Sequence, residues 1–403
     1  MAGRVAPYID NTGLVFAYDQ SNTVRSYVGE PTTNLAYAVN SYLNSNSNWW
    51  INAGNTVFND NDTSIPKPVI PNVDTTNLRV FSSTVTQTGG NQQLGSSIIT
   101  VSPSTTYSFS IYFYFTGTTL QIPPYVRTLV NNDLLAYFAY NGSTNYLTWP
   151  RSQWILLKAT VTTQANENGI YMSSYTGDTL GEKLAYFGYQ VEQKSHCTPL
   201  VLGTRSATQG LKDLTGRSTI NLSNVSFDSS AQMTFDGTDD YVGLAGFTQP
   251  SNPNIFSVEA VVKLFDHNAG TNIGSVIVNN YSSLNGWIFF LNGPNSKLSL
   301  RHHNGSATSY NVEYSSGINL NQWYHIAATD DGAVVRIYLN GTQIVTGTSA
   351  TSTNYSGQPL IGQFGGGNAM TYGNIPVVKI YNRTLTASEI QQNFNAVRGR
   401  YGI

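Results

Sequence analysis

Charged residues are scarce in this sequence. Only 10% of its 403 residues are Asp, Glu, Lys or Arg, and the formal net charge is -2. Average soluble domains carry about 25% charged residues. Because no run of Lys and Arg is present, the chain lacks the basic surface that neutralises phosphate groups. Nucleic acid is therefore excluded as an expected partner.

Cysteine and long apolar runs are scarce as well. The single cysteine, Cys197, excludes an intrachain disulfide framework. A cysteine nucleophile needs a base, and only His196 is close in sequence, so a packed thiol is the favoured interpretation. No run of about 18 apolar residues predicts a membrane helix, and the opening MAGRVAPYIDN has no apolar signal core. We therefore expect assembly in a cytoplasm without membrane insertion.

What the sequence does contain is a repeated two-residue alternation typical of β-strands. Residues 108–115 (SFSIYFYF), 155–161 (ILLKATV) and 184–193 (LAYFGYQVEQ) alternate in this way, with turn residues between them. In WYHIAATDDGAVVRIYLNGTQIV, Asp-Gly and Asn-Gly predict two tight turns that join three strands. MTFDGTDDYV predicts a further hairpin around Asp-Gly. The pattern predicts an all-β fold of two β-sandwich, or jelly-roll, domains.

One short helix is expected at the C-terminal end. Thr386-Ala-Ser-Glu389 is a capping box, in which the Thr hydroxyl and the Glu carboxylate accept hydrogen bonds from each other's backbone N–H groups. The helix SEIQQNFNAV follows it. Residues 59–77 hold several prolines among Asn and Asp, which indicates an extended loop.

Four segments carry a resemblance to a known family: GLKDLTG, MTFDGTDDYV, NQWYHIAATDDGAVVRIYLNG and IPVVKIYNRTLTASEIQQNFNAVRGRYGI. They resemble the LamG-like, concanavalin-A-type jelly rolls of tailed-bacteriophage virion proteins. Such domains usually open with a strand of the type G-L-V-x-x-x-D, and GLVFAYD stands at residues 13–19. The resemblance implies a discontinuous jelly roll of residues 1–33 plus 202–403. Residues 34–201 are then an inserted β-sandwich similar to a carbohydrate-binding module.

The resemblance implies a non-enzymatic virion surface protein, a decoration, fibre or adhesion component with a capacity for glycan binding. Its expected partners are other virion proteins, host-surface glycans and further copies of itself. One alternative is a glycan-cleaving enzyme on a concanavalin-A-type fold, which needs two carboxylates flanking the glycosidic bond. Glu259 has no carboxylate two or four positions away on its strand. The other alternative, a secreted lectin-like adhesin, would be favoured by a signal peptide and disulfides.

Exposed tyrosines give the candidate glycan site. By alternation, four residues of the insertion are predicted to project from the non-core face of its sheet: Tyr112, Tyr114, Tyr186 and Gln190. The apolar C–H faces of sugar rings stack on Tyr, and their hydroxyls bond to amides. A packing interface with another domain or subunit explains the same residues equally well, since Tyr is also enriched in interfaces.

No cofactor is expected, and Ca²⁺ is the only metal that the acidic residues suggest. Asp60 and Asp62 in NDNDTS are its candidate ligands because no strand pair flanks them. The acidic DGTDD segment, residues 236–240, is interpreted as a hairpin turn instead. His302 and His303 are adjacent on a strand end and point to opposite faces, which indicates a surface turn rather than a zinc site.

Overall fold

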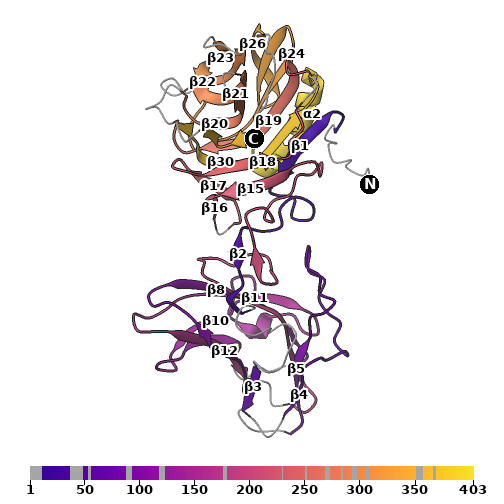
Figure 1. Cartoon of the computed structure of the whole chain (residues 1–403). Helices are drawn as coiled ribbons and strands as arrows, with labels where there is room; N and C mark the ends of the chain where they lie inside the picture. Colours follow the sequence, from indigo (N-terminus) through magenta and orange to yellow (C-terminus); the bar gives the residue numbers. More distant parts are fainter. Residues whose placement is uncertain are drawn as a thin grey trace. The chain divides into compact units, whose positions relative to one another are not determined.

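A computed structural model describes residues 11–36, 49–52, 56–87, 93–117, 123–175, 179–228, 230–249, 252–267, 273–282, 285–292, 297–304, 309–350, 357–365 and 369–403. The chain forms two compact units, coloured by sequence in Figure 1. Unit 1 comprises Met1–Pro31 with Ser206–Ile403, and unit 2 comprises Thr32–Arg205. Almost all regular structure in the described residues is strand, so the predicted all-β class is confirmed. No helix of these residues is long and apolar enough to span a membrane.

Unit 1 is a sandwich of two antiparallel sheets. The first has the order β16 (Ser226–Phe227), β17 (Met233–Asp236), β30 (Tyr372–Tyr381), β19 (Ile255–Leu264), β24 (Trp323–Asp331), β25 (Val334–Leu339) and β26 (Thr342–Thr348). The second has the order β15 (Thr219–Ser223), β18 (Tyr241–Ala245), β27 (Leu360–Ile361), β20 (Val276–Ser282), β21 (Asn285–Asn292), β22 (Lys297–Asn304) and β23 (Ser309–Gly317). A small ladder joins β28 (Gln363–Phe364) to β29 (Ala369–Met370). Val258, Trp287 and Phe289 belong to the buried core.

The Gly-containing turns predicted in unit 1 join neighbouring strands of one sheet in one case and strands of different sheets in another. The predicted three-strand meander is confirmed as β24, β25 and β26, with positive φ at Gly332 (87°) and Gly341 (80°). The predicted hairpin in MTFDGTDDYV is wrong, because β17 lies in the first sheet and β18 in the second. Phe235 and Val242 both enter the one core from these two sheets. The Asp-Gly segment is therefore an arch between sheets, which has the same local sequence pattern as a hairpin.

The strand β1 (Leu14–Asp19) comes from the N-terminal end and pairs antiparallel with β30. Phe16 and Tyr18 are both fully buried, and the Tyr18 hydroxyl donates a hydrogen bond to the Ile375 carbonyl at 2.7 Å. On the other side of β1, the Asp213 carboxylate accepts from the Ala17 N–H at 3.1 Å. The first strand of unit 1 thus lies between two elements that both follow the insertion in the sequence.

Helix α2 (Ala387–Tyr401) covers the outer face of the first sheet. The predicted capping box is confirmed, with Glu389 N–H donating to the Thr386 hydroxyl at 3.3 Å and Thr386 N–H donating to the Glu389 carboxylate at 2.7 Å. Under the helix, Glu259 pairs with Lys379 at 3.3 Å and accepts two hydrogen bonds from the Asn393 amide. Burial raises the pKa of Glu259 above its usual value. This buried carboxylate is part of the helix packing.

The predicted surface turn at His302 and His303 is part of a strand, with His302 buried and His303 half-buried. His302 is buried in β22, packs against Phe256 and lies 3.3 Å from the Asp330 carboxylate, so the predicted surface turn is wrong. The strand continues to Asn304 and is paired on both sides, which the local sequence does not reveal. His303 does point the other way, against Tyr281. Burial lowers the pKa of His302 to about 4.

Unit 2 is a second sandwich. One sheet has the order β10 (Leu134–Tyr137), β9 (Tyr125–Thr128), β12 (Gly169–Tyr175), β6 (Gln93–Ser96) and β3 (Trp49–Asn52), and β7 (Ile99–Thr100) also pairs with β12. The other has the order β11 (Ile155–Thr162), β8 (Thr106–Phe115), β13 (Lys183–Glu192), β5 (Phe81–Val85) and β4 (Thr56–Asn59). A short 3-10 helix, η1 (Tyr146–Thr148), follows β10. The chain enters and leaves this unit through the paired strands β2 (Thr32–Thr33) and β14 (Thr204–Arg205).

The position of Phe16 predicts that unit 1 depends on the N-terminal strand. Phe16→Ala removes a fully buried ring and should lower the free energy of unfolding of unit 1 by about 3–5 kcal/mol. Hydrogen exchange of peptides from β30 and β19, read by mass spectrometry along a urea series, measures this loss. Val24→Ala is the control, because Val24 is 72% exposed and its truncation should change stability by less than about 0.5 kcal/mol. Faster exchange confined to residues 11–31 would contradict the dependence.

Acid should destabilise unit 1 through His325. Burial, followed by the charge of Lys379, lowers the pKa of His325 to about 3, whereas an unfolded His has a pKa of about 6.5. The unfolded chain therefore binds this proton first, and the stabilisation present above pH 6.5 is lost as the pH falls towards 3. His325→Gln should reduce the slope of unfolding free energy against pH by up to about 1.4 kcal/mol per pH unit. Urea titrations between pH 6 and pH 4 measure the slope, and an unchanged slope would contradict the prediction.

Candidate functional site

The predicted glycan platform on β8 and β13 is not an open surface. Tyr112 and Tyr114 are half-buried, whereas Tyr186 and Gln190 are completely buried, each with 0% exposure. The loop and tail segments that cover this face carry the apolar residues Ile65, Ile70, Leu78, Val80, Leu200 and, partly buried, Val73 and Leu202. Tyr186 and Gln190 therefore cannot contact a glycan in this fold, and the prediction of an exposed face is wrong.

A β-bulge in β13 explains the error for Tyr186. The pairing of β13 with β8 shifts register between Phe187 and Gln190, and Gly188 has a φ of 62°. Tyr186 lies in the main core before the bulge, and Tyr189 lies there after it. Strict alternation places two residues three positions apart on opposite faces, so it cannot assign both correctly.

Gln190 does lie on the side predicted for it, but it is enclosed there. Its amide donates to the Glu192 carboxylate at 2.7 Å, and its carbonyl oxygen accepts from the Val201 N–H at 2.7 Å. The tail of unit 2 is thus fixed over β13 by these hydrogen bonds. Gln190 is a structural residue of that tail.

The predicted metal ligands Asp60 and Asp62 are engaged with protein donors. Asp60 forms an ion pair with Arg79 at 2.8 Å. Asp62 accepts hydrogen bonds from Ser82 at 2.7 Å and from Lys183 at 3.1 Å. Burial opposes ionisation of Asp62, but hydrogen bonds from Ser64, Ser82 and Lys183 outweigh it and lower its pKa to about 2. The two carboxylates serve separate interactions and do not form a ligand set.

Three other carboxylates do converge, in the arch between β17 and β18. Asp236, Asp239 and Asp240 each place one carboxylate oxygen within 4.8 Å of the others. Asp240 also accepts from the Asp236 N–H at 2.7 Å, and burial raises its pKa to about 6. Within the described residues, this is the group of acidic side chains suited to a hard cation such as Ca²⁺.

The tyrosine-rich surface of unit 2 lies on the sheet opposite to the predicted one. We call it the tyrosine face and define it by Tyr125, Arg127, Tyr137, Tyr171 and Tyr175. Their strand neighbours Val126, Ile170 and Met172 point into the main core. In β9 and β12 the tyrosines and Arg127 therefore project from the outer side by the alternation of a strand.

Tyr125 is the base of the tyrosine face. Its ring stacks on Tyr175 with centroids 6.3 Å apart, meets Tyr137 edge-on at 6.3 Å, and lies 4.9 Å from the Arg127 guanidinium. As a result Tyr125 is only 1% exposed, while Tyr137 is 41% exposed. Burial raises the pKa values of Tyr125 and Tyr171, so both hydroxyls stay protonated at neutral pH. The face thus combines aromatic rings with hydroxyl and guanidinium donors.

A hollow of about 330 Å³ continues the tyrosine face at one end. It is lined by Ser96, Ser97, Ile98, Leu129 and Tyr171. Gly169 packs closely beside this hollow, since a Cβ there would come within 2.8 Å of both the Ile98 and the Leu129 side chains. Ile98 and Leu129 are 45% and 43% exposed. Since Tyr171 belongs to both the hollow and the tyrosine face, the two form one surface. None of the described residues that define this surface is acidic.

The loop beyond β9 holds the charged and hydroxyl groups of this surface in place. The Tyr171 hydroxyl donates to the Asn132 side chain, and Arg127 donates to the Asn132 carbonyl at 3.2 Å. Asn132 has a φ of 58°, a conformation that Asn adopts more readily than most residues. The signal for this site was present in the sequence as YVRT and GIYMSSY, in which Tyr and Arg alternate with apolar residues.

The comparisons with known proteins concern the fold. Residues 236–391 match Laminin_G_3, described as the concanavalin A-like lectin/glucanases superfamily. Unit 1 has a concanavalin A-like fold. No curated protein sequence matches the chain.

Solved structures of botulinum neurotoxin binding domains are similar to part of the chain. One, the binding domain of botulinum neurotoxin DC in complex with rat synaptotagmin II, has 17% identity and a TM-score of 0.40, over 48% of this chain and 50% of that one. The binding domain of serotype D has 14% identity and a TM-score of 0.39, over 46% and 49%. The chain thus spans about half the length of these structures.

Proposed function

We propose that the protein is a non-enzymatic glycan-binding protein of a tailed-phage virion surface, and that the tyrosine face is its glycan site. The observation that supports this most directly is the exposed aromatic surface around Tyr137, next to Arg127 and without an acidic residue among its defining members. Such a surface offers stacking and hydrogen bonds to a polyhydroxylated chain.

The chemistry of the tyrosine face matches that of a sugar chain. The apolar C–H face of a sugar ring stacks on an exposed Tyr ring, and the ring hydroxyls accept hydrogen bonds from Arg and Tyr. Tyr137 provides the most exposed ring of the set, and the stacked pair Tyr125 and Tyr175 fixes the surface beneath it. Because these groups are held by one another, binding requires little ordering of side chains.

The length of the face favours a chain over a single sugar. Tyr171 and Tyr175 are four residues apart on β12, or about 13 Å at a strand rise of about 3.3 Å per residue. The hollow beside Tyr171 extends the surface further. A glycan would therefore lie along the strand with more than one ring in contact.

The absence of catalysis is part of the proposal. Glycosidic cleavage needs an acid and a second carboxylate on either side of the bond. Glu259, the carboxylate considered from the sequence, is paired with Lys379 beneath helix α2. The described members of the tyrosine face supply neither role.

The virion location rests on the sequence segments that resemble phage proteins, as do the proposed contacts with other virion proteins and with further copies of the chain. A cation at Asp236, Asp239 and Asp240 is compatible with this function, because it would lie in unit 1 and leave the tyrosine face unchanged. The self-association alternative for a Tyr-rich surface is separated from glycan binding by the first experiment below.

Tyr137→Ala should weaken binding of host-envelope polysaccharide about tenfold or more, because it removes the most exposed stacking ring. Calorimetric titration of the full chain measures this. Tyr310→Ala is the matched control, since Tyr310 is 45% exposed but lies on β23 of unit 1. Equal polysaccharide binding by the unaltered protein, Tyr137→Ala and Tyr310→Ala would contradict the assignment of the tyrosine face as the glycan site. A change in sedimentation of Tyr137→Ala without any change in glycan affinity would assign the face to self-association.

The virion proposal predicts that the protein purifies with intact particles and releases no reducing sugar from host-envelope glycans. Labelled antibody on intact particles, together with a reducing-sugar assay of the purified protein, tests both parts. Sugar release that is abolished by a single Glu or Asp substitution would show that the protein is an enzyme. Unlabelled particles would refute the virion location.

A further inference from the structure

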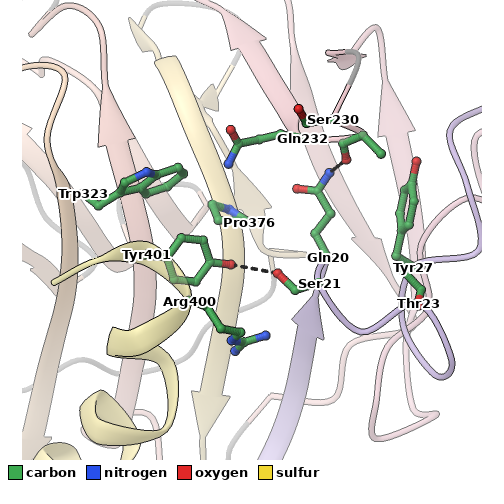
Figure 2. Close-up of a pocket in the computed structure, with 11 residues that line it drawn as sticks. Gln20, Ser21, Thr23, Tyr27, Ser230, Gln232, Trp323, Pro376, Arg400 and Tyr401 are labelled. Carbon is green, nitrogen blue, oxygen red and sulfur yellow. Dashed lines mark hydrogen bonds between the residues drawn. The ribbon is translucent and has the colours of Figure 1, made fainter. Parts of the chain in front are cut away.

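Unit 1 contains a pocket of about 340 Å³ that is built from both ends of its discontinuous chain (Figure 2). The turn after β1 contributes Gln20 and Ser21, and the end of helix α2 contributes Arg400 and Tyr401. Gln232, before β17, and Trp323, at the start of β24, also line it. We call it the terminal pocket. It belongs to the other unit from the tyrosine face.

We propose that the terminal pocket binds one uncharged sugar ring. This site is independent of the tyrosine face and does not require the function proposed for it. Its volume lies near the lower end of the range of about 300–1,000 Å³ for small-ligand pockets, so it accepts a single ring rather than a chain.

Gln20 provides the hydrogen-bond acceptor. The side chain is only 6% exposed, and its Nε2 donates to the Ala231 carbonyl, which fixes the orientation of the amide. Its Oε1 has no hydrogen-bond partner among the described residues. Figure 2 shows this oxygen on the side of the amide that faces Pro376 and Tyr401. A buried carbonyl oxygen without a donor costs free energy, which a ligand hydroxyl would recover.

Arg400 decides the charge of the ligand. Its Nη1 donates to both carboxylate oxygens of Asp19, at 3.0 and 2.7 Å. Asp19 thereby neutralises the guanidinium, so the pocket has no net positive charge to hold an acidic ligand. In the described chain only Nη1 of Arg400 makes a hydrogen bond, and its remaining N–H groups can donate to ligand hydroxyls.

Aromatic rings provide the apolar wall. Trp323 and Tyr401 have ring centroids 4.9 Å apart and an interplanar angle of 51°. The Tyr401 hydroxyl lies 3.2 Å from the Ser21 hydroxyl, which joins the helix end to the turn after β1. Figure 2 shows Trp323 across the pocket from Gln20. A ring between them would meet an apolar surface on one side and amide groups on the other, as a sugar requires.

Saturation-transfer NMR on the full chain tests the proposal. The probes are the methyl α-glycosides of glucose, galactose and mannose, with methyl glucuronide as the charged probe. We expect at least one neutral glycoside to bind. Ser230→Trp, which fills the pocket from its exposed rim, should abolish that binding. Gln232→Leu should weaken it about tenfold, because one amide that can bond to the sugar is lost.

Two controls separate this site from the others. Ser315→Trp places the same ring on exposed β23, outside the terminal pocket, and should leave glycoside binding unchanged. The glycoside measurements are also made in the Tyr137→Ala background, which removes the most exposed ring of the tyrosine face, so that binding abolished there by Ser230→Trp belongs to the terminal pocket. The proposal is overturned if no neutral glycoside binds, if binding survives Ser230→Trp, or if the glucuronide binds in place of the neutral probes. Loss of glycoside binding in Tyr137→Ala alone would assign the sugar to the tyrosine face.

Discussion

The antiparallel pairing of β1 with β30 is the interaction on which unit 1 depends. It joins Leu14–Asp19 to the last strand of the chain, across the whole insertion. Asp213 accepts from the backbone of β1 on its other side, so the strand is held by groups from both flanks. The same pairing brings the turn after β1 beside the end of helix α2, where Ser21 meets Tyr401. The terminal pocket is thus a consequence of the discontinuity of the domain.

Local features could be predicted from the sequence where their chemistry is local. The capping box at Thr386 and the turn at Asn340-Gly341 depend on side chains and φ angles within a few residues, and both form as expected. The arch at Asp236-Gly237 could not be distinguished from a hairpin, because the sheet that each flanking strand joins is decided by distant partners. The burial of His302 depends likewise on strands far along the chain.

In the candidate site, too, local features could be predicted and features set by distant contacts could not. The sequence predicted that Tyr side chains project from one sheet of the insertion, but it could not show which of the two sheets a loop would cover. Residues 65–80 and the tail near Leu200 bury the side with Tyr112, while the side with Tyr137 is exposed. The bulge at Gly188 then reversed the assignment of Tyr186. The covering loop and the bulge both depend on tertiary contacts, and neither alters the alternation of apolar and polar residues in the sequence.

The paired strands β2 and β14 also affect how the protein resists proteolysis. They are the two crossings of the chain between the units, and the Thr33 and Thr204 hydroxyls lie 3.1 Å apart there. Asn34 N–H also donates to the Gly203 carbonyl at 2.8 Å. A protease that cuts one crossing leaves the units covalently joined through the other, and the ladder between the crossings also holds the cut end. Two separate cleavages are needed to release the insertion, whereas a module attached at one end is lost after a single cut.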